Sequence, residues 1–234
     1  FGVVPRAHTS THAITLCVPR VAGVLLEHEC MTITHAMQDP DRPLVAVLGG
    51  AKVSDKIGVI KAFVDIADRI VIGGAMANTF LAHRGTFMGD SMYEPNQDEI
   101  IDEIYARAVR KVGRDKLDSF LVLPVDVGVG SSRSQHATRQ DVSAKTIPAG
   151  TMALDLGPVA TAVVRKAVDG AKTVIWNGTL GFAEVPAFAA SSRALAEELA
   201  THPEITSIIG GGDTADFVLH WDKKGGKSFT HVST

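Results

Sequence analysis

Five short apolar runs, rich in Val, Ile and Leu, each stop at or near a glycine or a small polar residue. They cover 44–48, 69–72, 119–123, 173–176 and 206–209. None alternates with polar residues, which is typical of parallel strands buried on both faces. Helical stretches separate them, at 54–67, 75–83, 97–112, 158–169, 187–200 and 213–220. This alternation predicts an α/β fold with three layers, α/β/α, around a mainly parallel sheet.

Composition sets the outer limits. The chain has 234 residues and is 45% hydrophobic, enough for one large domain or two small ones. A net charge of −3 gives no reason to expect a nucleic-acid partner. Two cysteines are too few for a disulfide framework, and no apolar run reaches the roughly 18 residues of a membrane span. There is no signal-peptide pattern, and a start at Phe1 without Met indicates a fragment or a processed product.

Three segments fall outside the regular pattern. Residues 1–19 are mixed and do not form a unit of their own, whereas 20–38 suit a helix that ends at Asp39-Pro40. Residues 126–150 are rich in Ser, Gly, Thr and Gln, and we expect a surface excursion there, with a short hairpin as one form of it. A last short strand is expected at 228–232.

The glycine-rich loops all follow strands, so they should meet at the carboxyl edge of the sheet, where such folds bind ligands. Glycine lets a phosphate approach backbone amides, and a helix N-terminus favours its negative charge. The loop at 49–56 adds two lysines, and the loop at 210–214 adds a carboxylate. Neither matches a P-loop or the G-x-G-x-x-G fingerprint, which argues against a dinucleotide oxidoreductase.

Each charged residue also has a plainer interpretation. Lys56, in the first turn of a helix, opposes the helix dipole unless an anion lies beside it, and it could simply be solvated. Asp213 could bind Mg²⁺ or could cap its helix.

The remaining candidates are weaker taken singly. Gly73 and Gly74 could border a base or ribose, or could serve tight strand–helix packing. Glu184 could accept from ribose hydroxyls, or could favour a helix start. The i,i+4 pair His8 and His12 lacks a third zinc ligand.

Seven motifs occur in one order and spacing along almost the whole chain. They are GGAKVSDKI at 49–57, GGAMA at 73–77, LPVD at 123–126, LDLGP at 154–158, WNG at 176–178, GGGDTA at 210–215 and HVST at 231–234. In this respect the sequence resembles phosphoglycerate kinase. That family has two Rossmann-like domains joined by a long helix. The resemblance implies a remnant of the N-terminal substrate domain at 1–19, the interdomain helix at 20–38 and a nucleotide-binding domain at 39–234 whose C-terminal end is missing.

The resemblance also implies roles for single residues. Lys52 and Gly212 would act on the phosphoryl group in transfer, Asp213 would hold Mg²⁺, and Arg6 would bind the substrate. The implied nucleotide-binding residues are Gly50, Ala51, Lys56, Gly73, Gly74, Gly157, Pro158, Asn177, Glu184, Gly211, Gly212, Asp213 and Thr214.

The implied reaction is reversible phosphoryl transfer between 1,3-bisphosphoglycerate and ADP, giving 3-phosphoglycerate and ATP in glycolysis. A cytoplasmic monomer that needs Mg²⁺, with no nucleic-acid or membrane partner, is expected from the resemblance. Pro5 stands where the family usually has a substrate-binding histidine, and Thr179 and Ala183 also depart from its pattern. We therefore expect this piece to be poorly active alone. The alternative is a non-catalytic nucleotide-binding module or pseudoenzyme.

Overall fold

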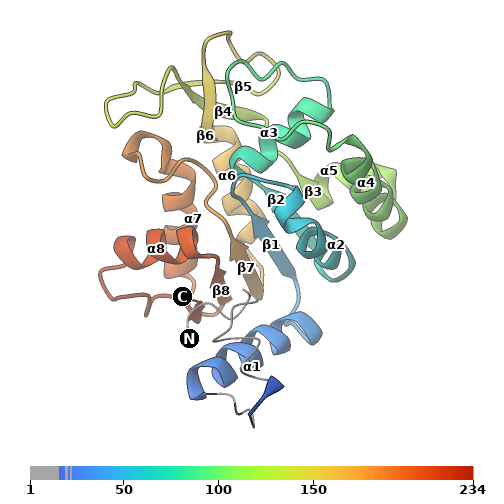
Figure 1. Ribbon diagram of the computed structural model, residues 1–234, viewed down its shortest axis with the longest axis vertical. Coiled ribbons are helices and arrows are strands. Elements are labelled where there is room, and N and C mark those ends of the chain that lie inside the picture. Colours follow the sequence, from blue (N-terminus) through green and yellow to red (C-terminus); the bar gives the residue numbers. More distant parts are fainter. Residues whose placement is uncertain (1–15, 19–20, 22, 234) are drawn as a thin grey trace.

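The computed structural model describes residues 16–18, 21 and 23–233. Its centre is a sheet in the order β3-β2-β1-β7-β8-β9, in which all pairs are parallel (Figure 1). The strands are β1 Leu44–Leu48, β2 Arg69–Ile72, β3 Leu121–Val122, β7 Thr173–Asn177, β8 Thr206–Gly210 and β9 His231–Val232. The predicted α/β fold is confirmed.

Alternate residues of the central strand face opposite layers. In β1, Leu44 and Ala46 pack with one buried cluster, while Val45 and Val47 pack with the other. Both kinds of position are apolar because both faces are covered, which is why the run does not alternate.

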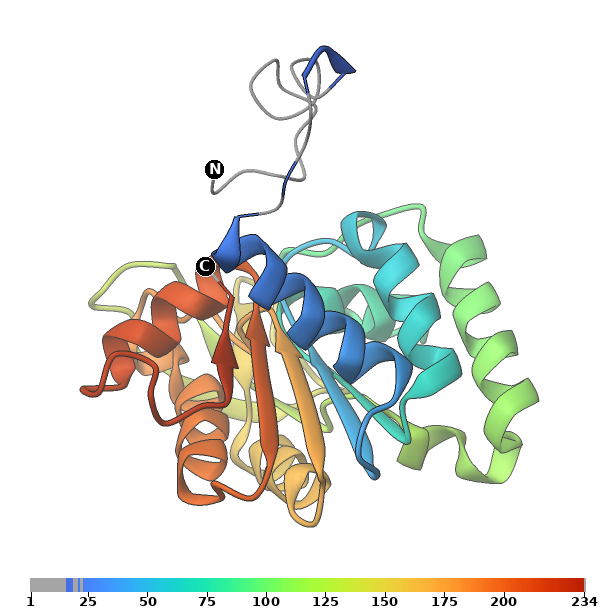
Figure 2. The same cartoon turned by 90° about the horizontal axis from the view of Figure 1, so that it is seen from below.

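Helices fill the two outer layers. The first cluster takes α1 Val24–Gln38, α2 Ile57–Ile66, α3 Gly74–His83 and α4 Asp98–Val112, and the second takes α6 Pro158–Val168, α7 Ala190–Thr201 and α8 Gly212–Trp221. Figure 2 shows α1 crossing the sheet on the side of α2. Short turns of 3-10 helix lie at Ser54–Lys56, Arg114–Lys116 and Pro186–Phe188.

Two predicted strands are shorter in the structure. The run at 119–123 begins as the end of the short helix α5, Leu117–Phe120, so only Leu121–Val122 pairs with β2. The run at 228–232 contributes only His231–Val232, because residues 223–230 form turns.

The interpretation of 126–150 as a surface excursion is wrong for its first part. Strands β4 Asp126–Gly130, β5 Gln140–Ser143 and β6 Met152–Leu156 form a second, antiparallel sheet in the order β5-β4-β6. Val127 and Val129 are buried in a small core of their own. The glycines between these valines hid a two-residue alternation that is typical of a strand. The expected hairpin exists, as the β4–β5 pair, and β6 was not predicted.

Among the described residues, every helix is too short or too polar to cross a membrane.

Candidate functional site

Four loops at the carboxyl edge of the large sheet are joined by hydrogen bonds, two between backbones and one from a backbone amide to a side chain. Gly50 N donates to Thr179 O at 3.2 Å, and Gly74 N donates to Leu180 O at 2.9 Å. Gly178 N donates to the Thr214 hydroxyl at 2.7 Å. Thr179, which departs from the family's pattern, takes part through its carbonyl. The loops after β1, β2, β7 and β8 therefore form one continuous surface, as predicted.

Glycine makes this approach possible. A Cβ on Gly49 would lie 2.1 Å from Thr179 O, and one on Gly178 would lie 2.3 Å from Gly49 O. No other residue allows two backbones so close.

A cleft of about 210 Å³ opens beside these loops. Of the predicted nucleotide-binding residues, the following line it: Gly50, Ala51, Gly74, Glu184 and Asp213. Its far wall comes from the antiparallel sheet, through Val127, Ala153 and Leu156. Val127, Ala153 and Leu156 form an apolar part of the lining, and Arg133, Asp155, Glu184 and Asp213 are its charged residues.

Lys56 is not a solvated lysine. It lies in the 3-10 turn before α2, close to the predicted helix start, and its Nζ donates to three oxygens. These are Gly49 O at 2.8 Å, Asn177 O at 3.0 Å and Asn177 Oδ1 at 2.8 Å. Burial lowers the pKa of the Lys56 ammonium, while the charges of Asp213 and Asp55 oppose that change. The ammonium is thus held between two loops, near the carboxylate of a third.

Asp213 is not a helix cap. The cap position of α8 is Gly211, at φ 88°, and this residue has no side chain with which to cap the helix. Asp213 is exposed in the first helical turn and lines the cleft. Within the described part of the chain, no three His, Cys, Asp or Glu residues gather to hold a metal. A single carboxylate fits Mg²⁺ that arrives with phosphate oxygens and water, rather than a metal centre built by the protein alone.

Several predicted residues do not line the cleft. Lys52 is exposed in the turn after β1. Gly73 packs on Leu180 of the loop after β7, where a Cβ would lie 2.5 Å from Cδ2. Thr214 is buried and its hydroxyl holds the Gly178 amide. Gly212 begins α8. Arg6 and Pro5, like His8 and His12, lie outside the described residues.

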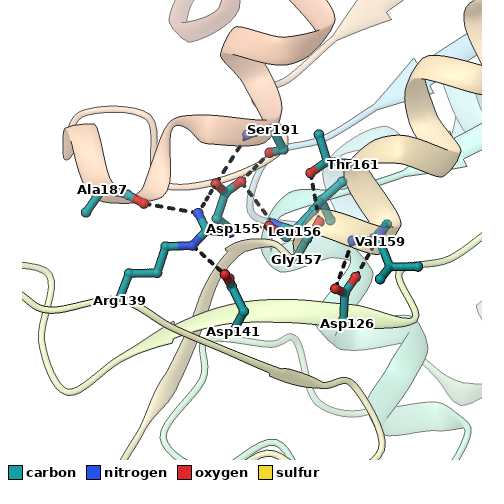
Figure 3. A network of polar contacts seen from close by, with 11 residues as sticks. Asp126, Arg139, Asp141, Asp155, Leu156, Gly157, Val159, Thr161, Ala187 and Ser191 are labelled. Carbon is teal, nitrogen blue, oxygen red and sulfur yellow. Dashed lines mark hydrogen bonds and ion pairs between the residues drawn. The ribbon is translucent and has the colours of Figure 1, made fainter.

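Gly157 and Pro158 start helix α6 at the end of β6. Asp126 accepts from the amides of Val159 at 3.0 Å and Ala160 at 2.6 Å, and so caps the helix from a neighbouring strand (Figure 3). A Cβ on Gly157 would lie 2.2 Å from Cγ of Asp126. These two residues therefore shape the strand end next to the cleft wall.

Sequence reasoning missed one polar group beneath the cleft. Asp155 lies in β6 with its side chain fully buried, and it pairs with Arg139 at 2.6 Å (Figure 3). Burial raises the pKa of the Asp155 carboxyl, while hydrogen bonds from Ser191 and Arg139 oppose the rise. A carboxylate inside the apolar run Met-Ala-Leu-Asp-Leu was the available signal.

Comparisons with known proteins identify one family. Residues 1–234 match the family model described as phosphoglycerate kinase. The phosphoglycerate kinases of Roseiflexus castenholzii and Chloroflexus aurantiacus are 41% and 42% identical to the chain, over 97% and 100% of its length. The chain spans 58% and 57% of those two curated relatives.

Solved structures give the same result. The phosphoglycerate kinase from Coxiella burnetii superposes with a TM-score of 0.83 at 34% identity, covering 91% of this chain and 53% of that one. The enzyme from Pyrococcus horikoshii, at 23% identity and a TM-score of 0.78, shares the fold over 100% of this chain and 56% of its own. This chain belongs to the phosphoglycerate kinase family.

Proposed function

We propose that this chain is the nucleotide half of an enzyme that transfers a phosphoryl group reversibly between 1,3-bisphosphoglycerate and ADP, giving 3-phosphoglycerate and ATP. The observation that carries the proposal is the placement of Lys56 and Asp213. They lie on the loops after β1 and β8, and the Trp-Asn-Gly loop after β7 connects both through Asn177, Gly178 and Thr214. A cation and a carboxylate at glycine-rich helix starts suit a magnesium nucleotide.

The proposed pose runs along the cleft. Phosphates lie over Gly50, Ala51 and Gly211–Thr214, with Lys56 as their counter-charge and Asp213 toward the metal. The base lies against the apolar wall near Gly74 and Leu156, close to Gly157 and Pro158. Glu184 accepts from the ribose hydroxyls at the side of the cleft.

The chemistry asked of these residues is positioning and charge neutralisation, since the transferred group passes directly between two oxygens. Lys52 is exposed on the loop after β1, from which its ammonium can reach the phosphoryl group during transfer. Asn177 and Gly212 border the phosphate end of the cleft. Mg²⁺ supplies charge neutralisation between the phosphate oxygens when bound.

The acyl phosphate must come from a part of the parent protein beyond this cleft. We assign 1–19, with Arg6, to the substrate domain, 20–38 to the interdomain helix and 39–234 to the nucleotide domain. The assembled enzyme is proposed to be a cytoplasmic monomer.

Calorimetric titration of the chain with MgADP tests the site. We expect saturable binding that weakens at least about tenfold in Asp213→Asn and in Lys56→Ala, because each removes a charged contact worth about 1.5–3 kcal/mol. Asp216→Asn is the matched control, since it removes the same charge from an exposed position of the same helix. Absence of binding by the folded wild-type chain would contradict the proposal, as would equal loss in the control.

A rate measurement separates the enzyme from the non-catalytic alternative. The chain alone, with 3-phosphoglycerate and MgATP, is expected to turn over very little. Adding the substrate domain in the parent protein should restore the rate. A parent protein that binds MgADP but stays inactive would instead identify a nucleotide-binding module.

A further inference from the structure

A buried ion pair, Asp155 with Arg139, lies beneath the cleft wall. Asp155 in β6 has a fully buried side chain, and Arg139, just before β5, is 17% exposed. The Asp155 carboxylate also accepts from its own neighbour Leu156 N at 2.9 Å, from Ser191 N at 3.3 Å and from the Ser191 hydroxyl. Every oxygen of this carboxylate is thus engaged (Figure 3).

The Arg139 guanidinium connects separate parts of the chain. It donates to Leu156 O at 2.7 Å, to Ala187 O at 3.0 Å and to Asp141 Oδ1 at 2.8 Å. A planar group with several donors in fixed directions holds its acceptors in fixed relative positions. The end of β6 and the segment before α7 are therefore held together through one side chain.

Between these contacts runs the loop that carries Glu184. Its first residue, Gly181, packs directly on the carboxylate, since a Cβ there would lie 2.3 Å from Asp155 Oδ1. Phe182 N donates to Leu154 O, at 2.7 Å, on the strand of Asp155. After the loop, Ala187 in the 3-10 turn accepts from Arg139, and Ser191 in the first turn of α7 donates to Asp155. Both ends of the segment 181–191 thus rest on Asp155 and Arg139.

The middle of the loop is held by the chain segment that precedes Arg139. Gln135, on the segment that leads to Arg139, donates from Nε2 to Glu184 O at 2.9 Å. The Glu184 side chain itself is left exposed at the cleft. The backbone oxygen of Glu184 is held by this hydrogen bond, while the residue is exposed and is one of those that line the cleft.

A buried ion pair adds little to stability, because the cost of desolvating its two charges offsets much of their attraction. Such a pair can instead fix one arrangement of the groups around it. We propose that Asp155 and Arg139 are positioning residues, which hold the Glu184 loop against the cleft and so set the selectivity for the ribose hydroxyls of a bound nucleoside diphosphate. This inference rests on the function proposed above.

The test compares MgADP with its 2′,3′-dideoxy analogue, titrated into the whole chain by calorimetry. The wild type is expected to prefer ADP by about tenfold or more, the value of one hydrogen bond to a charged group. Glu184→Gln should lower that preference. Asp155→Asn and Arg139→Met should lower it to a similar level, and Asp155→Asn combined with Glu184→Gln should lose little more, because the two residues act as one unit.

Glu198→Gln is the matched control. Glu198 is a largely buried carboxylate on α7 that pairs with Arg165, at 2.6 Å, away from the cleft. Its variant should lose thermal stability without changing the preference for ADP. If Asp155→Asn fails to fold, Ser191→Ala removes one bond to the same carboxylate, and it should shift the preference in the same direction.

The outcomes separate the inference from the function on which it rests. Equal weakening of both ligands in the Asp155, Arg139 and Ser191 variants, with the preference intact, would show a merely structural role and overturn the inference alone. A wild type without preference for ADP would also overturn it. A folded wild type that binds neither nucleotide would overturn the proposed function, and the inference with it.

Discussion

Replacing Lys56 by methionine should separate ligand affinity from stability. In the unliganded chain the ammonium donates three hydrogen bonds, whose favourable energy is set against the cost of burying its charge. Its lowered pKa, caused mainly by burial, shows that this position disfavours the charge. Methionine removes that penalty but leaves three oxygens without the donor. We therefore expect Lys56→Met to change the free energy of unfolding by only about 1 kcal/mol, in either direction.

Nucleotide affinity should respond far more. A phosphate that replaces one of the three protein acceptors of Lys56 loses a charge-assisted bond of about 1.5–3 kcal/mol in the variant, which corresponds to about a tenfold to 150-fold rise in the Kd for MgADP. Calorimetry gives the Kd, and urea unfolding gives the stability. Lys61→Met, on the outer part of α2 where the lysine pairs with Glu103, is the matched control and should leave the Kd unchanged.

The reasoning would be refuted in two ways. Binding of MgADP by Lys56→Met with wild-type affinity would mean that the ammonium has only a structural role between its two loops. A loss of stability as large as the loss of binding energy would mean that burial does not offset its hydrogen bonds.

Three further changes can be measured on the same chain. Gly74→Ala places a Cβ at φ +63° and 2.8 Å from the Gly50 backbone, and it should lower the free energy of unfolding by about 1–3 kcal/mol. Gly58→Ala, in open space on α2, should raise it by about 0.5–1 kcal/mol. Equal effects of the two substitutions in urea titrations would contradict this. Asp126→Ala removes the cap of α6 and should cost about 0.5–2 kcal/mol, also seen in urea; an unchanged midpoint would disprove the capping role. At alkaline pH the affinity for MgADP should fall as pH rises through the lowered pKa of Lys56, because binding then requires proton uptake; the fall should begin below the ordinary lysine value of 10.5 and vanish in Lys56→Met. A flat profile for the wild type up to that value would exclude Lys56 as the phosphate's partner.

Local pattern was sufficient for the inner strands of the large sheet, but not for its two edge strands. The runs at 44–48 and 69–72 match strands β1 and β2 residue for residue, since strands covered on both sides must be apolar throughout. The hydrophobic pattern failed for β4, where a glycine-rich composition conflicts with the strand pairing that the structure shows. In β4, glycines dilute the buried valines, and the strand is recognisable only through its partners β5 and β6.

The candidate site was likewise predictable only in part. That Lys56 and Asp213 come from loops at one sheet edge followed from the order of strands and glycines. Their surroundings did not, because the acceptors of Lys56 lie 7 and 121 positions away in the chain. The Asp155–Arg139 pair also depends on contacts between distant segments. Sequence spacing identifies charged groups, but only the packed chain shows whether a charge is solvated, capped or held.

The glycines of this edge explain why the charged residues can be altered separately from the fold. Gly49, Gly74 and Gly178 stand where backbones approach each other too closely for any side chain. The shape of this loop surface is therefore set by main-chain contacts, and a substitution at these positions disturbs the folding of the loops themselves. Asp213 and Lys52 are exposed on that surface, so their replacement leaves the backbone contacts intact. Loss of affinity in variants of these two residues, with unfolding unchanged, can then be assigned to their charge.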